Sequence, residues 1–337
     1  QAGYRVATLL WPTAGRSGVR YCLPEIQPVR PGQSLVRLAL GAGSPLFTLA
    51  LMLRHLALLK DLRYSVLDDV TCSAACRLLD RDRVELVLLH LVDLDGVRHE
   101  RGFRGAWVEP TLRDMDRRLG ELIEAGGGLG GSTAFVVFGD HAYLDVHTAI
   151  APNALLRQAG LIQVDGSPPA GRRGRRGAPR VRDWQAWAVA CGGSAHVYLR
   201  HPQDARLRQQ VRSLLGELAH GLDGPVERIY EQGEAQRERV GHDVDFVLEA
   251  RPGFCFVPEL EEVSREAVQA ATHGYHPDRP GYSSLALAAG AGVRRGGQLA
   301  AARIVDLGPT LAALLGLSLP QAEGRVLSAI FAEGASP

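Results

Sequence analysis

The sequence predicts an α/β fold in which helices cover both faces of a mostly parallel sheet. Short apolar runs alternate along the chain with longer segments whose apolar residues recur at helical spacing. The run at 84–92 is almost continuously apolar, as expected of a parallel strand covered on both faces. The 337 residues are 46% hydrophobic and 22% charged, which provides for a large core. We therefore expect one domain over 1–337.

In the first half of the chain, strands and helices are expected in turn. Residues 4–11 form a short apolar run that stops before Pro12, which indicates a strand. Residues 47–62 and 67–79 are interpreted as helices, and the strand at 84–92 follows them.

The next helix and strand have clearer patterns. Residues 109–124 carry apolar side chains at helical spacing, namely Leu112, Met115, Leu119, Leu122 and Ile123. Residues 133–139 ("TAFVVFG") then predict a strand that ends at a glycine.

The second half continues the alternation. Strands are expected at 194–199, 245–250 and 282–290. An amphipathic helix that ends at a glycine is expected at 203–221. A short helix at 306–317 is indicated by Asp306 before it, Pro309 in its first turn and Gly316 near its end.

One segment has no apolar periodicity. Residues 165–182 are rich in arginine, glycine and proline, and we expect an exposed loop. Its six arginines could contact phosphate, although a solvated loop is the preferred interpretation.

Charge and cysteine content restrict the partners and the compartment. The formal net charge of +1 indicates neither a nucleic-acid-binding surface nor a membrane partner. The longest apolar stretch is interrupted by Arg54 and His55 and is too short to span a bilayer. Five scattered cysteines and the lack of a visible signal peptide favour a reducing compartment, and hence the cytoplasm.

Three groups of metal-binding residue types lie beside predicted strands. In the first, Asp93, Asp95 and His99 follow the strand at 84–92. Ligand sites in α/β proteins are built just beyond the carboxyl ends of the strands. A carboxylate and an imidazole both suit zinc, whereas a solvated loop with a surface histidine is the alternative.

The second group follows the strand at 133–139. Asp140 and His141 are adjacent there, and a turn at Gly139 would allow both side chains to face one metal. We interpret the nearby His147 as a bystander.

The third group precedes the strand at 282–290. His273 is followed by Gly274, with His276 and Asp278 close by in the sequence. Taken together, the three groups supply most of a two-metal site of the kind that promotes phosphoryl displacement.

Four segments then occur in a distinctive order. They read "DLDGVRHERG", "GDHAYLDV", "THGYHPDRPGYSSLALAAGAGV" and "LGPTLAALLGLSLPQAEGRVL". They resemble successive blocks of the nucleotide pyrophosphatase/phosphodiesterase family, the type I phosphodiesterases of the alkaline phosphatase superfamily. The resemblance implies an alkaline-phosphatase-like fold, with a central, mostly parallel sheet between helices.

The resemblance also implies a set of metal ligands. Asp95, His99 and His273 would hold one metal, and Asp140 and His141 would hold part of the other. The expected cofactors are therefore two divalent ions, zinc with manganese as the alternative. Arg98 is expected either to face the phosphoryl oxygens of the substrate or to form a surface salt bridge.

One part of the family pattern is not found. The family's first strand, with an aspartate ligand and a threonine or serine nucleophile, should precede Trp11, where only Thr8 lies inside a strand. Asp68, Asp69 and Thr71 stand at a helix start and are interpreted as capping residues. We therefore expect a partial catalytic domain that is incomplete at the N-terminus and contains no nucleophile.

Two explanations of this difference remain open. The chain is a partial sequence of an active enzyme, or it is a natural short form that binds metal without forming a phospho-enzyme. A lost central strand would expose a sheet edge, so the chain alone is expected to be marginally stable or aggregation-prone.

The expected function is hydrolysis of a small-molecule phosphodiester, pyrophosphate or phosphomonoester by the complete enzyme. The alternatives are a non-catalytic metal-binding protein and a phosphomutase or sulfatase-type enzyme of the same superfamily.

Overall fold

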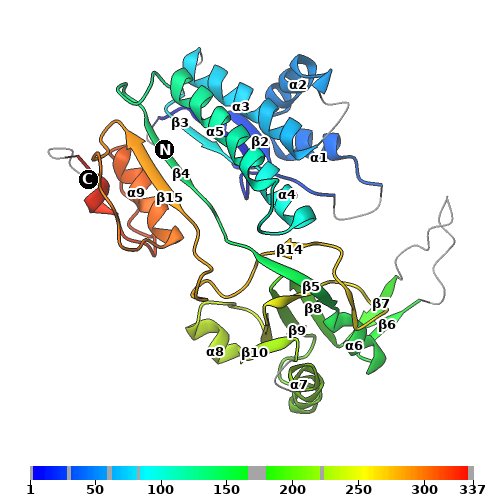
Figure 1. Cartoon of the computed structure of the whole chain (residues 1–337). Helices are drawn as coiled ribbons and strands as arrows, with labels where there is room; N and C mark the ends of the chain where they lie inside the picture. Colours follow the sequence, from blue (N-terminus) through cyan, green and yellow to red (C-terminus); the bar gives the residue numbers. More distant parts are fainter. Residues whose placement is uncertain are drawn as a thin grey trace. The chain divides into compact units, whose positions relative to one another are not determined.

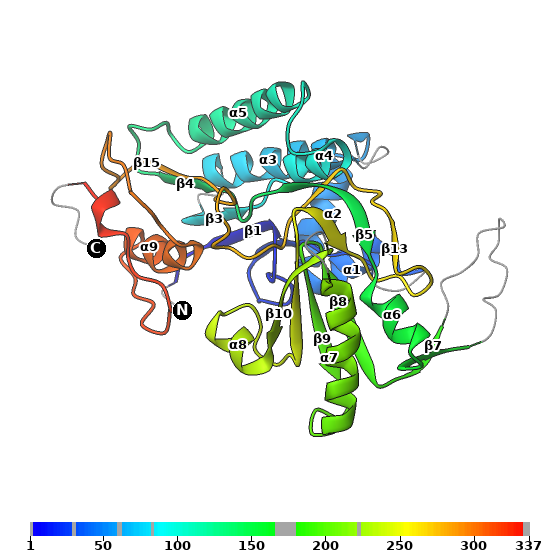
Figure 2. The same ribbon diagram turned by 60° about the horizontal axis from the view of Figure 1, so that its bottom comes forward.

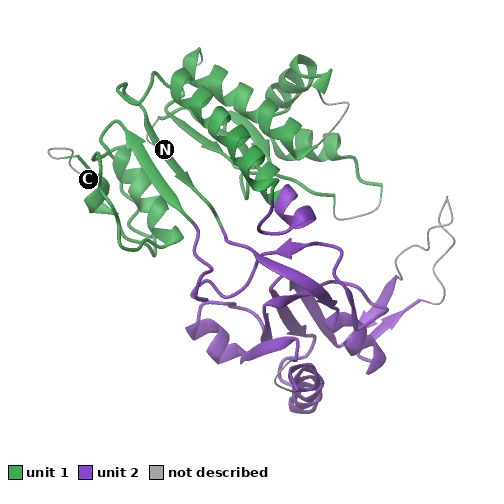
Figure 3. Ribbon diagram, viewed as in Figure 1, with its two compact units in different colours: residues 1–96, 106–140, 285–337 green, residues 97–105, 141–284 purple. Residues whose placement is uncertain are grey.

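The computed structural model describes residues 3–28, 32–58, 63–81, 84–165, 180–220 and 224–332. It confirms the α/β class, and the chain divides into two compact units (Figure 3). Unit 1 contains 1–96, 106–140 and 285–337, whereas unit 2 contains 97–105 and 141–284. A single domain stays a prediction. Of the predicted loop at 165–182, residues 166–179 lie outside the described residues.

Unit 1 contains a parallel three-stranded sheet. Its strands are β1 (Val6–Trp11), β2 (Tyr21–Pro24) and β3 (Leu86–Leu89), in the order β2-β1-β3. Both pairings are parallel, as the apolar runs predict. Ala7 and Leu9 of β1 are fully buried against Ala75 and Leu78 of the helical layer. Burial of these apolar side chains attaches the helices to the sheet.

The helices of unit 1 differ from the expectations at their ends. They are α1 (Leu35–Ala42), α2 (Pro45–Arg54), α3 (Tyr64–Asp80) and α5 (Val108–Ala125). The helix predicted at 47–62 ends at Arg54, and α1 was not predicted. The α1 helix ends at Gly43, where a Cβ would lie 2.6 Å from the Cys22 carbonyl oxygen. No described helix has the length and apolar character needed to cross a membrane.

A second sheet of unit 1 is antiparallel. Strand β4 (Ala134–Phe138) pairs with β15 (Ala286–Gly290), and α9 (Leu307–Leu314) lies in the same C-terminal part of the chain (Figure 1). Within the described part of the chain, β3 pairs only with β1 and β4 pairs only with β15. Each of these strands therefore ends a sheet there.

Unit 2 is built on antiparallel pairing, which the sequence did not predict. Four strands follow the order β10-β11-β9-β8 and comprise β8 (Ala186–Cys191), β9 (Ser194–Leu199), β10 (Val226–Glu231) and β11 (Phe246–Ala250). Helix α7 (Ala205–Ala219) packs on this sheet through Leu207, Val211 and Leu215 (Figure 2). This amphipathic helix confirms the prediction for 203–221.

The rest of unit 2 surrounds β5 (Leu144–Ile150). This strand pairs with β12 (Gly253–Phe256) in parallel and with β13 (Ser264–Glu266) and β14 (Ala271–Thr272) in antiparallel. It was not predicted, because the exposed Asp145 and His147 interrupt its apolar residues and leave no continuous apolar run. Helix α6 (Pro152–Gln158) follows β5, and β6 (Ile162–Val164) pairs with β7 (Val181–Trp184).

Candidate metal centre

The first predicted ligands lie on a helix, although the sequence indicated only a segment leaving a strand. Helix α4 (Asp93–Arg101) begins four residues after β3 ends. Asp95 and His99 are four residues apart on α4, so their side chains share one face. Acidic residues in its first turn interact favourably with the positive end of the helix dipole, and basic residues in its last turn interact favourably with the negative end. Both interactions stabilise this short helix.

The imidazole of His99 is oriented by a backbone carbonyl. Its Nδ1 lies 2.9 Å from the carbonyl oxygen of Ala271. A carbonyl oxygen only accepts, so Nδ1 is the protonated nitrogen and donates this hydrogen bond. The lone pair is then on Nε2, the arrangement that metal-ligating histidines adopt when the other nitrogen is hydrogen-bonded.

Three further rings of unit 2 gather at His99. His141 and His273 are stacked, with ring centroids 3.7 Å apart and planes inclined by 16°. His99 lies 5.1 Å from His273, and Tyr143 contacts all three rings at 5.0 to 5.6 Å. The structure therefore brings together the histidines of all three sequence groups.

A carboxylate is the other candidate ligand type. Asp95 belongs to unit 1, His141 and His273 belong to unit 2, and each can offer one ligand atom to a metal. Zinc binds imidazole nitrogen and carboxylate oxygen at about 2 Å. The family pattern pairs His141 with Asp140, and which residues share an ion stays a prediction.

Asp140 lies in unit 1. Its carboxylate acts electrostatically on His90 of unit 1. The hydrogen bond that His90 Nδ1 donates to the Glu25 carboxylate is the main reason why the pKa of His90 is raised, and the charges of Glu25 and Asp140 add to it.

Arg98 lies against aromatic rings. Its guanidinium carbon is 5.0 Å from the ring centroid of Phe103 and 5.1 Å from that of Tyr143. Cation–π contacts of this kind help to hold a guanidinium in place. The contact with Tyr143 places Arg98 near the histidines, and a role in substrate binding stays a prediction.

His273 is held by a tight turn that the sequence reasoning did not find. Gly193, in the turn joining β8 to β9, donates a hydrogen bond of 2.7 Å to the His273 carbonyl. A Cβ on Gly193 would lie 2.4 Å from the Tyr275 ring, and one on Gly192 would lie 2.4 Å from the His273 oxygen. Gly274 has a φ of +89°, which favours glycine. The adjacent glycines between two strands were the signal that could have revealed this turn.

The predicted capping residues have other roles. Asp68 and Thr71 lie inside α3, because that helix begins at Tyr64, so the capping prediction for this helix was wrong. Thr71 donates to the carbonyls of Leu67 and Asp68. Asp68 instead accepts hydrogen bonds from backbone groups at the start of α4.

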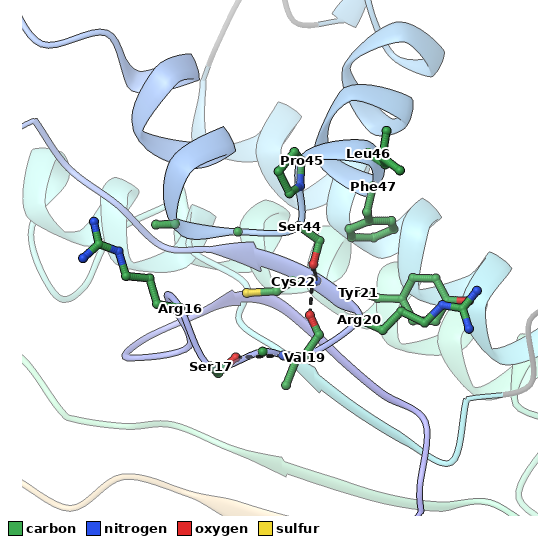
Figure 4. Close-up of a pocket in the computed structure, with 13 residues that line it drawn as sticks. Arg16, Ser17, Val19, Arg20, Tyr21, Cys22, Ser44, Pro45, Leu46 and Phe47 are labelled. Carbon is green, nitrogen blue, oxygen red and sulfur yellow. Dashed lines mark hydrogen bonds between the residues drawn. The ribbon is translucent and has the colours of Figure 1, made fainter.

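Unit 1 contains a separate cavity of about 620 Å³ between the β1–β2 loop and the start of α2 (Figure 4). Tyr21 and Phe47 meet edge to face at 5.5 Å, and Arg20 lies over Tyr21. Ser44 donates to the Val19 carbonyl. The residues that line the cavity include one thiol, that of Cys22, and no carboxylate or imidazole, so they do not supply the set of ligands that a metal site needs.

Comparison with known families decides the assignment. The family model of type I phosphodiesterase/nucleotide pyrophosphatase matches residues 1–276. The chain belongs to this family. Its family and fold support a phosphodiesterase-type hydrolase that cleaves phosphodiester or pyrophosphate bonds. No curated protein sequence matches the chain.

Solved structures of this type I phosphodiesterase family show the same fold. Human ectonucleotide pyrophosphatase/phosphodiesterase 5 is 15% identical, with a TM-score of 0.60 over 96% of this chain and 70% of that chain. The murine protein is 16% identical, with a TM-score of 0.60 over 98% and 72%. An inactive murine variant in complex with AMP is 17% identical, with a TM-score of 0.59 over 95% and 69%.

Proposed function

We propose that the chain binds divalent metal ions through the carboxylates and imidazoles that the sequence singled out, and that these ions serve the hydrolysis of a small phosphate ester. The proposed ligands are Asp95, His99, Asp140, His141 and His273. The observation that carries the proposal is the gathering of three imidazoles, of which one is oriented by a carbonyl. Stacked imidazoles at this spacing fit a shared cation better than three separate surface histidines.

Zinc is the proposed ion, with manganese as the alternative. Imidazole nitrogen and carboxylate oxygen are both good zinc ligands, and a set richer in carboxylates would favour manganese. The expected number of ions is two, because five ligands are more than one tetrahedral ion uses.

The proposed chemistry divides between the ions and the protein. When bound, the ions would act as Lewis acids on the phosphoryl oxygens and on the attacking group. Arg98 would orient the phosphoryl group by donating N–H hydrogen bonds to its oxygens. The Ala271 carbonyl would keep His99 in one tautomer. No nucleophile is assigned to this chain, since Thr8 is buried within β1.

The proposed substrate class is a nucleotide-type phosphodiester or pyrophosphate. The family's description includes nucleotide pyrophosphatases, and one murine relative was solved with AMP. We also propose a reducing compartment, the cytoplasm, because the five cysteines are free. Alkylation of the native protein from its source cells, followed by mass spectrometry, should find all five thiols; a disulfide would contradict this assignment.

The test measures metal binding and hydrolysis separately. Zinc and manganese affinities are obtained by chelator competition for the purified chain, for His273→Ala and for the control His147→Ala. His147 contacts Thr148 and Phe254 instead of the three imidazoles. Hydrolysis of bis-p-nitrophenyl phosphate is followed with each metal, alongside p-nitrophenyl phosphate and p-nitrophenyl sulfate.

We expect the chain to bind metal, His273→Ala to lose affinity by at least 100-fold, and His147→Ala to stay within about 2-fold. Diesterase turnover with metal would support the hydrolase. Metal binding without turnover of any ester would favour the non-catalytic metal-binding protein. Preference for the sulfate ester would favour a sulfatase-type enzyme, and no metal binding at all would overturn the proposal.

A further inference from the structure

A buried carboxylate from α3 reaches the start of the helix that carries two proposed ligands. Asp68 is 0% exposed. Its Oδ1 accepts a hydrogen bond of 2.7 Å from the Val92 backbone N–H, and its Oδ2 accepts one of 3.0 Å from that of Asp93. The N–H groups at the start of a helix have no partner within the helix. Asp68 therefore caps α4 from a distant part of the sequence.

A buried arginine from α5 holds the carboxylates at this position. Arg118 is 1% exposed. One of its terminal nitrogens, Nη1, lies 3.9 Å from Asp68 and 3.6 Å from Asp93. Its Nε donates to Asp69 at 2.9 Å, and Nη2 donates to the Ser65 carbonyl at 3.1 Å. The guanidinium thus connects α3, α4 and α5.

Helix α4 also approaches α3 closely, at Gly96. A Cβ on Gly96 would lie 2.1 Å from the ring of Tyr64. Gly96 directly follows the proposed ligand Asp95, so the Tyr64 ring packs against the α4 backbone next to that ligand. Two independent contacts, one polar and one steric, therefore fix α4 against α3.

We propose that Asp68, held in place by Arg118, is a positioning residue that sets the orientation of α4 and thereby aims Asp95 and His99 at the metal. This inference rests on the proposed metal site. Removal of partners that orient metal ligands typically weakens metal binding by 10- to 100-fold. Asp68 would act in this way through the helix backbone and without touching the ion.

A purely stabilising role explains the arrangement less well. Burying carboxylates and a guanidinium costs desolvation free energy, and well-packed apolar residues are often at least as stabilising. Burial raises the pKa of Asp68 to about 6, which reflects this cost. What an apolar side chain cannot do is accept two N–H hydrogen bonds and so define where α4 begins.

The experiment compares Asp68→Asn with Asp69→Asn in the full chain. Both substitutions remove a carboxylate from α3 that faces Arg118, but only Asp68 bonds to α4. The zinc dissociation constant is measured by chelator competition, the d–d spectrum is recorded with Co²⁺, and metal-free melting temperatures are compared. We expect Asp68→Asn to weaken zinc binding by 10- to 100-fold and to change the Co²⁺ spectrum. Asp69→Asn should stay within about 2-fold.

Each outcome decides between the two proposals. If Asp68→Asn melts lower yet binds zinc like the wild type, Asp68 is only structural and the inference is overturned while the metal site stands. If the wild type binds no metal, both proposals fall together.

A measurement on the wild type covers the case in which Asp68→Asn does not fold. Hydrogen exchange at the Val92 and Asp93 amides is followed with and without zinc. Positioning predicts at least 10-fold slower exchange of these two amides with zinc, because ion binding and ordering of the α4 start are then linked. Equal exchange rates would overturn the inference.

Discussion

Several buried polar residues stabilise the protein through the backbone of distant segments. Asn153 of α6 donates to the Ala188 carbonyl at 2.7 Å and accepts from the Ala188 N–H at 2.8 Å. Asp245 accepts from the Leu199 N–H in the same manner. A buried peptide group that loses its partner costs the free energy of its desolvation. Asn153 thereby fixes α6 against β8, and Asp245 fixes the start of β11 against the end of β9.

Asn153→Ala should lower the free energy of unfolding by about 2–4 kcal/mol, because two buried backbone groups of Ala188 lose their partner. Urea unfolding followed by circular dichroism measures the change. The control is Gln158→Ala on the same helix, at an exposed position, with an expected change within about 0.5 kcal/mol. Equal effects of the two substitutions would contradict the role of Asn153.

His90 introduces a pH dependence into unit 1. Its Nδ1 lies 3.1 Å from the Glu25 carboxylate, and that hydrogen bond raises the pKa of His90 above 6.5 in the folded protein. The folded state therefore holds the proton more tightly than the unfolded state. The stabilisation is complete below about pH 6.5 and is lost as the pH rises through the raised pKa.

The prediction compares wild type with His90→Gln in the presence of EDTA. Between pH 6 and pH 8.5, the melting temperature of the wild type should fall more than that of His90→Gln. Parallel curves would show that the pair of His90 and Glu25 contributes nothing to stability. EDTA removes metal, whose binding to the nearby proposed ligand Asp140 would add its own pH dependence.

At the scale of elements, short connections do much of the positioning. The turn between β8 and β9 leaves no space for a side chain at Gly193, and its N–H bonds to the His273 carbonyl. Helix α4 similarly places two proposed ligands on one face within nine residues. Both elements are too short to be stable alone, so their geometry depends on what they pack against.

Gly193→Ala tests the turn. The added methyl group would lie 2.4 Å from the Tyr275 ring, so the turn must shift and move His273. We expect zinc affinity to fall by about 10-fold or more, together with a lower melting temperature.

The control is Gly216→Ala inside α7, where an added Cβ meets nothing within 4 Å. This substitution should raise the free energy of unfolding by about 0.5–1 kcal/mol and leave zinc affinity unchanged. Unchanged zinc binding in Gly193→Ala would show that the turn does not position His273.

At the scale of the whole molecule, α2 and the residues just after it carry several exposed apolar side chains. Leu46 is 85% exposed and Leu53 is 65% exposed, and Leu49 and Leu56 nearby are also exposed. Contiguous exposed apolar side chains favour association. Among the described residues, β3 and β4 are also edge strands of their sheets, and an edge strand can pair with a strand of another molecule. The expected tendency of this chain to aggregate therefore has a structural basis and stays a prediction.

The double substitution Leu46→Ser with Leu53→Ser should reduce concentration-dependent association without lowering the melting temperature. Sedimentation velocity over a range of protein concentrations measures it. Leu129→Ser, at a position that is 48% exposed on the α5–β4 connection, is the control and should leave association unchanged. Undiminished association in the double variant would place the contact elsewhere, for example at the strand edges.

Much of the fold could be predicted because its signals are local. Apolar periodicity and continuous apolar runs depend on neighbouring residues, and they correctly predicted β1, α3, α5, β4, α7 and β11. Segments whose burial depends on distant partners were not predicted. Strand β5 is an example, because its exposed polar residues interrupt the apolar pattern of its buried residues.

The sequence by itself determined the α/β class, the family and the residue types that can hold metal, because these depend on composition, spacing and motif order. Only the tertiary structure decided that Asp95 and His99 share a helix, that the ring of His273 stacks on that of His141, and that Asp68 caps α4. These facts depend on hydrogen bonds and close contacts between residues far apart in the chain. Such contacts form only after the chain has folded, and no local pattern records them.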